Sequence, residues 1–392
     1  MYISFNYSKK QQTYIILRRK VKNILIFIAD SLRWDYTPHE LRQVGLNFKC
    51  VAASIFTPPS FASLVTGLNV PRHGVMNFVH TIPLGIPTIF ELPLNTYYWD
   101  DDEITLYKIF HEPLRESLKK AKEPFIYLER ACETHVPYST DFKTVEDYLR
   151  ARGKNTNIIK EDYKRGVQKV YERFVKRIKI LKERGILNRT LIIFTSDHGE
   201  NLGERGKLLF HNFPVCPELV YVPFILIHPL IPKGEIKNEI IRHVDLLPTI
   251  IDILRFDVNW NFEGINILKN NRKICGFNYY RRLWRNLTCV SVWTYDGGYV
   301  KLEGSIFDII KSIIVDIIKY THDLSPIKYH CRTVVYGSTI ENAEEFIKIF
   351  KKKATYGFLD NIYEGPKLKK SAKISIIQKT RLIKKKLLYH DK

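Results

Sequence analysis

Ligand-type side chains follow three apolar stretches of the sequence, at or just beyond the point where each stretch ends. The side chains are Asp30, His135, Asp197 and His198, and the apolar stretches that precede them are 24–29, 125–128 and 191–194. Short apolar runs of this kind are typical of buried strands, and ligands of open α/β sheets bind outside the carboxyl ends of the strands. Because carboxylates and imidazoles are common metal ligands, these strand ends predict a metal-centred hydrolytic site.

The elements that must position these side chains alternate along the chain. Apolar side chains at three- and four-residue spacing from Tyr163 to Leu181 predict a long amphipathic helix that ends at Gly185. A further apolar run, 224–227, predicts another buried strand, and the stretch 243–254 predicts a turn that enters a helix. This alternation favours an α/β fold in which a mainly parallel sheet is sandwiched by helices.

Thr57 stands at the predicted start of a short helix. It is followed by Pro58 and Pro59, which the first helical turn tolerates because its amide hydrogens have no acceptor within the helix. Residues 61–66 continue the helix and Gly67 ends it. A helix N-terminus attracts an anion through its free amide hydrogens and its dipole, so Thr57 is expected beside an anion-binding position.

The chain divides into four expected regions. They are an N-terminal extension (1–21), a large domain that carries the predicted site (22–270), a smaller α+β subdomain (271–365) and a basic tail or helix (366–392). In the subdomain, residues 295–298 predict a hairpin turn, and the stretch 306–318 predicts a core-facing amphipathic helix because Asp308, Lys311 and Asp316 interrupt its apolar residues. The basic tail fits a helix that contacts nucleic acid or an anionic membrane, and a solvated terminal helix is the simpler interpretation.

The composition narrows the class of protein. The chain has 392 residues, of which 45% are hydrophobic, and this is enough for a substantial core. Its 62 Lys and Arg against 41 Asp and Glu give a net charge of +21, which favours anionic partners such as phosphoesters, sulfated sugars, nucleic acid or lipid; a compositional bias is the alternative explanation. The six cysteines show no C-x-x-C spacing, which argues against a zinc ribbon and a disulfide framework. Without a secretory signal pattern or an apolar run of about 18 residues, the expected location is cytoplasmic, with no transmembrane segment.

From about residue 20 to residue 270, the order of the motifs resembles the sulfatase-like branch of the alkaline phosphatase superfamily. Asp30-Ser-Leu-Arg-Trp-Asp is similar to the family's first metal-binding strand end, and the segment Thr57-Pro-Pro-Ser-Phe-Ala-Ser-Leu-Val-Thr-Gly67 is similar to its nucleophile turn. The later family elements are matched by His135-Val-Pro-Tyr138, Ser196-Asp-His-Gly-Glu200, His211, Val222-Pro223 and Asp245-Leu-Leu-Pro-Thr249. The resemblance implies an alkaline-phosphatase-like fold and an ester hydrolase or transferase.

Four positions depart from the sulfatase pattern. Sulfatases oxidise a Cys or Ser at the nucleophile position to formylglycine, which Thr57 cannot form, and their motif arginine is replaced here by Phe61. A threonine in this place resembles instead the phosphodiesterase, phosphotransferase and mutase relatives. The paired aspartates of many sulfatases are Asp30 and Ser31 here, and His198 stands where sulfatases have asparagine. The histidine makes the site more suitable for Mn²⁺ or Zn²⁺.

The resemblance and the chemistry of the side chains together imply the roles of the site residues. The predicted metal ligands are Asp30, Thr57, Asp197 and His198, and the predicted catalytic residues are Thr57, His135, His211 and Lys207. One divalent cation (Mn, Mg, Ca or Zn) would activate the metal-bound Thr57 hydroxyl, which attacks the anionic ester and forms a covalent intermediate. His135 and His211 would donate hydrogen bonds to the transferred group or protonate the leaving group, and Lys207 would add a fixed positive charge.

Three functions remain open at this point. The first is a metal-dependent hydrolase or transferase of phosphate-type or sulfate esters that uses Thr57. The second is a literal sulfuric ester hydrolase that works without formylglycine. The third is a non-catalytic protein that binds an anionic polymer through a degenerate metal site and its basic tail. His243 and Asp245 are interpreted as structural residues, so one metal ion is expected.

Overall fold

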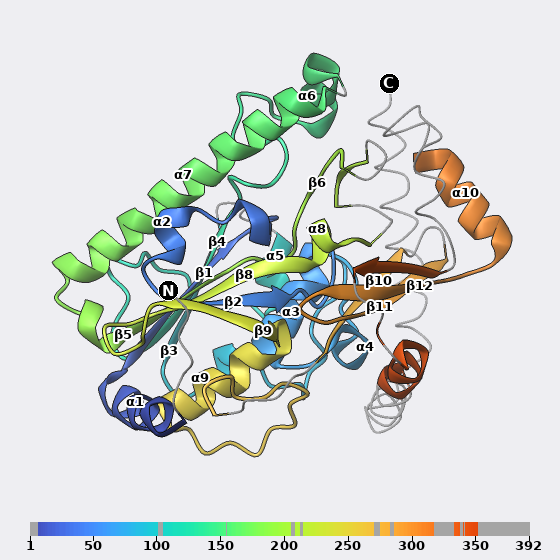
Figure 1. The fold of residues 1–392 in the computed structure, drawn as a ribbon. Coiled ribbons are helices and arrows are strands. Elements are labelled where there is room, and N and C mark those ends of the chain that lie inside the picture. The colour runs from blue at the N-terminus through green and yellow to red at the C-terminus, as the bar shows by residue number, and fades with distance from the viewer. Residues whose placement is uncertain are drawn as a thin grey trace, which may run out of the picture.

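A computed structural model describes residues 7–100, 105–153, 155–204, 208–211, 215–269, 275–282, 286–316, 333–337, 340 and 342–351. Its centre is a seven-stranded sheet, shown in Figure 1. In spatial order the strands are β3 (Asn95–Trp99), β4 (Phe125–Ala131), β1 (Asn23–Ala29), β5 (Thr190–Thr195), β8 (Tyr221–Ile227), β2 (Leu46–Val51) and β9 (Gly234–Arg242). All neighbours are parallel except that β8 runs antiparallel to both β5 and β2. The predicted α/β class with a mainly parallel sheet is confirmed.

The register of the central strands brings their carboxyl ends level. Ala29, the last residue of β1, pairs with Ala131 at the end of β4, and Ile28 pairs with Thr195 at the end of β5. The residues that follow β1 and β5 therefore meet at one edge of the sheet, as expected for adjacent parallel strands.

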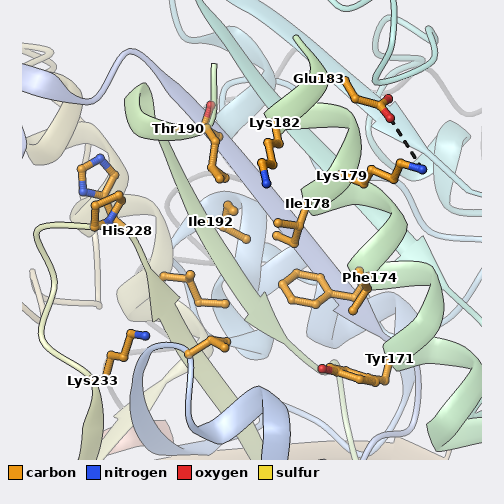
Figure 2. A pocket seen from close by; sticks show the side chains of 15 residues that line it. Tyr171, Phe174, Ile178, Lys179, Lys182, Glu183, Thr190, Ile192, His228 and Lys233 are labelled. Atoms are coloured by element: carbon orange, nitrogen blue, oxygen red, sulfur yellow. Dashed lines mark ion pairs between the residues drawn. The ribbon is translucent and has the colours of Figure 1, made fainter. Parts of the chain in front are cut away.

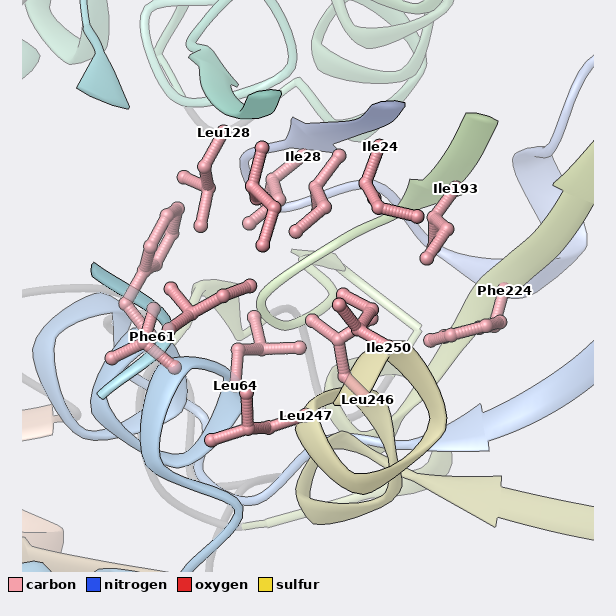
Figure 3. Close-up of a cluster of buried hydrophobic side chains, with 14 of the residues drawn as sticks. Ile24, Ile28, Phe61, Leu64, Leu128, Ile193, Phe224, Leu246, Leu247 and Ile250 are labelled. Atoms are coloured by element: carbon pink, nitrogen blue, oxygen red, sulfur yellow. The ribbon is translucent and has the colours of Figure 1, made fainter. Parts of the chain in front are cut away.

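One face of the sheet is covered by α3 (Thr57–Thr66), α9 (Leu246–Leu254) and, beside α9, α1 (Tyr7–Lys20). Figure 3 shows the resulting core, in which the side chains of α3 and α9 face apolar side chains of the strands. The labelled helical residues are Phe61, Leu64, Leu246, Leu247 and Ile250, and the labelled strand residues are Ile24, Ile28, Leu128, Ile193 and Phe224. Because α3 is packed into this core along its length, its first residue is held rigidly at the edge of the sheet.

The opposite face is covered by the long helix α7 (Thr156–Glu183), which confirms the predicted amphipathic helix (Figure 1). The side chain of Asn155 accepts hydrogen bonds from the first amide hydrogens of α7, and Gly185 adopts φ +65° just beyond its end. Phe174 packs edge-on against Phe27 and Phe194 of the sheet, with ring centroids 5.3 and 5.1 Å apart.

A groove of about 960 Å³ opens between α7 and the sheet, as shown in Figure 2. Its lining includes Tyr171 and Ile178 of α7 and Thr190 and Ile192 of β5. Thr190 is the first residue of β5, so the groove lies at the amino ends of the parallel strands. It is therefore at the other edge of the sheet from the predicted site.

A smaller antiparallel sheet follows in sequence. Its strands are β10 (Gly276–Arg282), β11 (Leu287–Trp293), β12 (Gly297–Glu303) and β13 (Thr333–Gly337), in that order. The predicted hairpin turn joins β11 to β12. The next helix, α10 (Ile306–Asp316), buries Ile309 but leaves Phe307 79% exposed, so only part of its apolar surface faces the core as predicted.

The remaining elements are short. They are η1 (Trp34–Tyr36), α2 (His39–Arg42), α4 (Val70–His73), η2 (Ile89–Glu91), α5 (Thr105–Ile109), α6 (Val145–Arg152), η3 (Leu187–Arg189), β6 (Asn201–Leu202), β7 (Leu209–Phe210), α8 (Pro217–Val220) and η4 (His243–Asp245). None of the helices in the described ranges has the length and apolar character needed to cross a membrane. The basic tail 366–392 lies outside the described residues, and its role, the four-region division and the cytoplasmic location stay predictions.

Candidate active site

Three predicted ligands meet at the carboxyl edge of the large sheet. Asp30 directly follows β1, and Asp197 and His198 come two and three residues after the end of β5. One ligand atom from each of these residues lies within 4.8 Å of the other two, and all three side chains are fully buried. Within the described part of the chain, this is the group whose geometry can hold a metal ion.

Hydrogen bonds orient two of these ligands and leave one carboxylate oxygen without a partner. Oδ1 of Asp197 accepts from the backbone N–H groups of Ser31 and His198, at 3.0 and 2.9 Å, whereas its buried Oδ2 has no hydrogen-bond partner. Nδ1 of His198 lies 2.9 Å from the carbonyl oxygen of Gly199. Because a carbonyl only accepts, Nδ1 carries the proton and Nε2 presents its lone pair toward Asp197 Oδ2, 3.4 Å away. An orphaned carboxylate oxygen beside an imidazole lone pair fits a divalent cation.

The electrostatics of the site also fit a cation. Burial and the neighbouring Asp30 charge raise the pKa of Asp197 well above its ordinary value. Burial acts in the same sense on Asp30, but the charge of Arg130, with His135 and His198, outweighs it and holds the pKa of Asp30 below its usual range. Burial lowers the pKa of His198 to about 3, so its imidazole is neutral at pH 7. A divalent cation would relieve the repulsion between the two carboxylates.

The structure brings Thr57 to the same place. Thr57 is the first residue of α3, after the extended Phe56, and its side chain is almost fully buried. Its Oγ1 lies 3.2 Å from Nε2 of His198. The predicted helix start is thereby confirmed, and the hydroxyl of Thr57 lies beside the ligand set at the positive end of the α3 dipole.

Two further predicted residues lie beside the ligand set. The ring of His211, which follows β7, is 4.6 Å from the ring of His198 and 5.1 Å from that of His135, measured between centroids. Nδ1 of His135 lies 2.7 Å from the carbonyl oxygen of Val136, so its Nε2 is available to another partner. Burial lowers the pKa of both His135 and His211. Lys207, the remaining predicted catalytic residue, lies outside the described residues.

The residues interpreted as structural have structural contacts. Nε2 of His243 lies 2.9 Å from the carbonyl oxygen of Ser196, and its Nδ1 accepts from the backbone N–H of Ala53 at 3.2 Å. Both ring nitrogens are therefore engaged in hydrogen bonds, and neither offers a free lone pair to a metal ion. Asp245 accepts from the side chain of Arg242 and from the backbone N–H of Ile265, at 2.7 and 2.9 Å. These two residues connect the turn before α9 to its neighbours.

Sequence reasoning missed Arg130, which follows the apolar part of β4. Its Nε and Nη2 donate to Oδ2 of Asp30 at 2.8 and 2.6 Å, and its Nη1 donates to Asp100 at 3.2 Å. Asp100 follows β3, so three adjacent parallel strands present Asp100, Arg130 and Asp30 side by side. The signal available in the sequence was a charged residue near the end of a strand, where Arg is seldom fully buried unless it is paired.

Ser31 and Glu200 were also given no role in the sequence analysis. Ser31 replaces the second aspartate of many sulfatases, and its hydroxyl donates to Oδ1 of Asp30 at 2.8 Å, so it orients a ligand instead of adding one. Glu200 is fully buried, and neither of its carboxylate oxygens has a hydrogen-bond partner among the described residues. Its Oε1 lies 3.5 Å from Nδ1 of His211, and burial raises the pKa of Glu200 well above its ordinary value.

Comparison with known proteins finds one matching family model and a related sequence. The sequence model of the Sulfatase family matches residues 84–256. The low-salt glycan biosynthesis sulfotransferase of Haloferax volcanii is 29% identical over 302 residues, which are 71% of this chain and 74% of that protein.

Solved structures of low sequence identity share the fold. A 2-O GAG sulfatase aligns with a TM-score of 0.63 and 13% identity, covering 87% of this chain and 92% of its own. The phosphonate monoester hydrolase of Agrobacterium radiobacter aligns with a TM-score of 0.60 and 13% identity, covering 79% of this chain and 94% of its own. Together with the matched family, these alignments confirm the resemblance seen in the order of motifs. From residue 84 to residue 256 the sequence is similar to the Sulfatase family, and the fold is that of solved sulfatases and phosphonate monoester hydrolases.

Proposed function

We propose that this protein is a metal-dependent hydrolase or transferase of phosphate-type or sulfate esters, with Thr57 as its nucleophile. The observation that carries the proposal is the position of the Thr57 hydroxyl, 3.2 Å from Nε2 of His198 at the start of α3. A helix N-terminus and a compact set of ligand side chains converge there on one hydroxyl.

Asp30, Asp197 and His198 would hold the divalent cation. When bound there, a divalent cation lowers the pKa of a neighbouring hydroxyl and offsets negative charge on the transferred group. The ligand set combines carboxylate oxygens with one imidazole nitrogen, which suits Mn²⁺ or Zn²⁺ as well as Mg²⁺ or Ca²⁺. We propose one ion per chain, in keeping with the one compact ligand group in the described part of the chain.

The side chains around this centre supply the remaining functions. Oγ1 of Thr57 would give up its proton to solvent and form a bond to the phosphorus or sulfur of the ester as the bond to the leaving oxygen breaks. His135 and His211 lie on one side of the centre, where their protonated forms would donate hydrogen bonds to the transferred group or a proton to the leaving oxygen. Water, or an acceptor alcohol in a transferase, then releases the group from Thr57. Lys207 is retained as a proposed source of positive charge.

The named activities of the relatives indicate which classes of ester to consider as substrates. The fold neighbours include enzymes named as a GAG sulfatase and a phosphonate monoester hydrolase, and the sequence relative is named as a sulfotransferase. A phosphate-type ester is the first choice because threonine cannot become formylglycine. Hydrolysis of a sulfuric ester is the second choice, supported by the match to the Sulfatase family. The open Oδ2 of Asp197 argues against a degenerate site in a mere binding protein.

The test compares Thr57→Ala with the wild-type protein on nitrophenyl phosphate, bis-nitrophenyl phosphate, nitrophenyl phenylphosphonate and nitrophenyl sulfate, each with Mn²⁺, Mg²⁺, Ca²⁺ and Zn²⁺. Thr66→Ala is the matched control, because Thr66 ends the same helix and its hydroxyl donates to the carbonyl of Ala62. Turnover that needs a metal and is lost only in Thr57→Ala supports the proposal. Turnover that survives in Thr57→Ala would overturn it, and turnover of the sulfate alone would select the second choice.

A further inference from the structure

Three aromatic side chains from separate parts of the chain meet beside the proposed nucleophile. Phe56 directly precedes α3, Phe78 follows α4, and Tyr280 lies in β10. The ring of Phe56 is 5.3 Å from that of Phe78 and 6.3 Å from that of Tyr280, and it meets both edge-on. These three side chains are called the aromatic wall below. Edge-to-face contacts of this kind hold aromatic rings in a defined arrangement.

The wall continues directly from the catalytic groups. The ring of Phe56 stacks on that of His211, with centroids 6.3 Å apart and an interplanar angle of 25°. His211 in turn lies 4.6 Å from His198, whose Nε2 is 3.2 Å from the hydroxyl of Thr57. A path of adjacent side chains therefore leads from the nucleophile through two imidazoles to the wall.

The small antiparallel sheet is fixed to this part of the molecule. The backbone N–H of Tyr279 donates to the carbonyl of Ala53 at 2.8 Å, and the side chain of Asn278 donates to the carbonyl of Ala52, also at 2.8 Å. Ala52 and Ala53 belong to the segment that leads from β2 to Thr57. Tyr280 is thereby held at a fixed position relative to the nucleophile, although it comes from a different sheet.

The wall is partly open to solvent. Phe78 is 39% exposed, and Phe56 and Tyr280 are partly exposed. By contrast, the nearby Phe61 is fully buried in the core beneath the same helix. Binding sites for small molecules are typically lined by aromatic side chains next to a few polar groups, and the wall beside His211 has this composition.

We propose that the aromatic wall binds the leaving group of the ester, and that this leaving group contains a ring with an apolar face, either a sugar ring or an aryl ring. The inference rests on the proposed function, because it places the leaving oxygen beside His211. A ring attached to that oxygen then contacts the aromatic wall. Binding energy gained from this part of the substrate, which does not react, raises kcat/KM for ring esters over linear ones.

The experiment measures kcat/KM of Phe78→Ala for three esters that carry the same transferred group. Their leaving groups are nitrophenol, glucose through its 6-hydroxyl, and n-butanol. Phe346→Ala is the matched control, because Phe346 is also 39% exposed and belongs to the helix 343–351, which packs on the small sheet through Ile347 and Phe350. We expect Phe78→Ala to lower kcat/KM about tenfold for one or both ring esters and less than about twofold for the butyl ester.

The two ring esters separate the sources of the ring, since a loss for glucose alone indicates a sugar and a loss for nitrophenol alone indicates an aryl ring. An equal change for all three esters, or no change for any, would overturn the inference while the turnover of the wild-type protein leaves the proposed function standing. If the wild-type protein turns over none of the esters, calorimetry measures their affinity for two proteins, Thr57→Ala and the double variant Thr57→Ala/Phe78→Ala. If a ring ester binds Thr57→Ala no more tightly than it binds the double variant that also carries Phe78→Ala, the proposed role of the aromatic wall is wrong.

Discussion

Two adjacent residues of β4 begin two buried charge clusters on opposite faces of the sheet. Glu129 faces α7, where it accepts from Arg173 at 2.8 Å and from Arg177 at 2.7 Å, and Glu133 pairs with Arg173 as well. Arg130 faces the side of α3, where it donates to Asp30 and Asp100. Both Glu129 and Arg130 are almost completely buried.

The two clusters differ in whether their charges are matched. On the α7 face, two guanidinium groups meet two carboxylates, and both oxygens of Glu129 accept hydrogen bonds. On the other face, Arg130 pairs with Asp30 and Asp100, Asp197 adds a third carboxylate next to Asp30, and Oδ2 of Asp197 is left without a hydrogen bond. Unmatched buried charge is costly. The first cluster is complete in charge, although Oε2 of Glu133 has no hydrogen-bond partner, whereas the second has an excess of negative charge that a bound cation would offset.

Substitution of Asp197 by Asn gives the largest expected effect, because it removes the open oxygen of the second cluster. We expect the affinity for Mn²⁺ to fall by about 100-fold or more and turnover to fall about 1,000-fold. Without metal, the melting temperature at pH 8 stays the same or rises, because Asn carries no charge beside Asp30. Calorimetric titration with Mn²⁺ and thermal melts check both points. A large fall in the melting temperature without metal would show that Asp197 is structural.

Substitution of Glu129 by Gln breaks the complete cluster and gives the second effect. Arg173 and Arg177 would lose their shared charged partner in a buried setting, which costs about 3–5 kcal/mol of the free energy of unfolding. Metal affinity is expected to remain within about twofold of the wild-type value, because the α7 face contributes no ligand. Urea unfolding and Mn²⁺ titration of the same preparation check this. A comparable loss of metal affinity would mean that the two clusters are coupled through β4.

Some parts of the fold and of the candidate site could be predicted from the sequence, and others could not. Strands β1, β4, β5 and β8 followed from apolar runs, and α3 and α7 from helical periodicity and the helix-ending Gly67 and Gly185, because these signals are local. Strands β2, β3 and β9 were not predicted. Asp30, Asp197 and His198 followed because a ligand after a strand must lie at the edge of the sheet, whatever the strand order. The antiparallel direction of β8 could not be predicted, since a buried apolar run reads the same in both directions.

The ion pairs of Arg130 and the contacts within the aromatic wall could not be predicted from the sequence either. Asp100 and Arg130 are 30 residues apart in the numbering and meet only because β3, β4 and β1 are neighbours in the sheet. Phe56 and Tyr280 meet only because β10 is hydrogen-bonded to the segment before α3. Long-range pairing of this kind depends on strand order and on how the two sheets pack. No spacing within the sequence records it.

The smallest expected effect is on the pH dependence of Mn²⁺ affinity. It tests what Arg130 contributes to the cluster with excess negative charge. Its charge helps to hold the pKa of Asp30 below the usual range, so that Asp30 stays ionised as the pH falls. In Arg130→Met this pKa rises, and protons compete with the metal at higher pH than in the wild-type protein. We expect the Mn²⁺ affinity of Arg130→Met to be about tenfold weaker at pH 6 and about twofold weaker at pH 8.

Arg130→Lys, which keeps the charge but loses the paired hydrogen bonds to Asp30, should fall between the two. Arg173→Met is the matched control, since it removes the same charge from the complete cluster and should lower stability without changing how Mn²⁺ affinity depends on pH. Asp197 has a raised pKa in the wild-type protein, so we expect all of these proteins to bind metal more weakly as the pH falls. The contribution of Arg130 is the additional displacement of the binding curve toward higher pH. Parallel curves for Arg130→Met and the wild-type protein would place Arg130 with Glu129, as a structural ion pair that happens to lie beside a metal ligand.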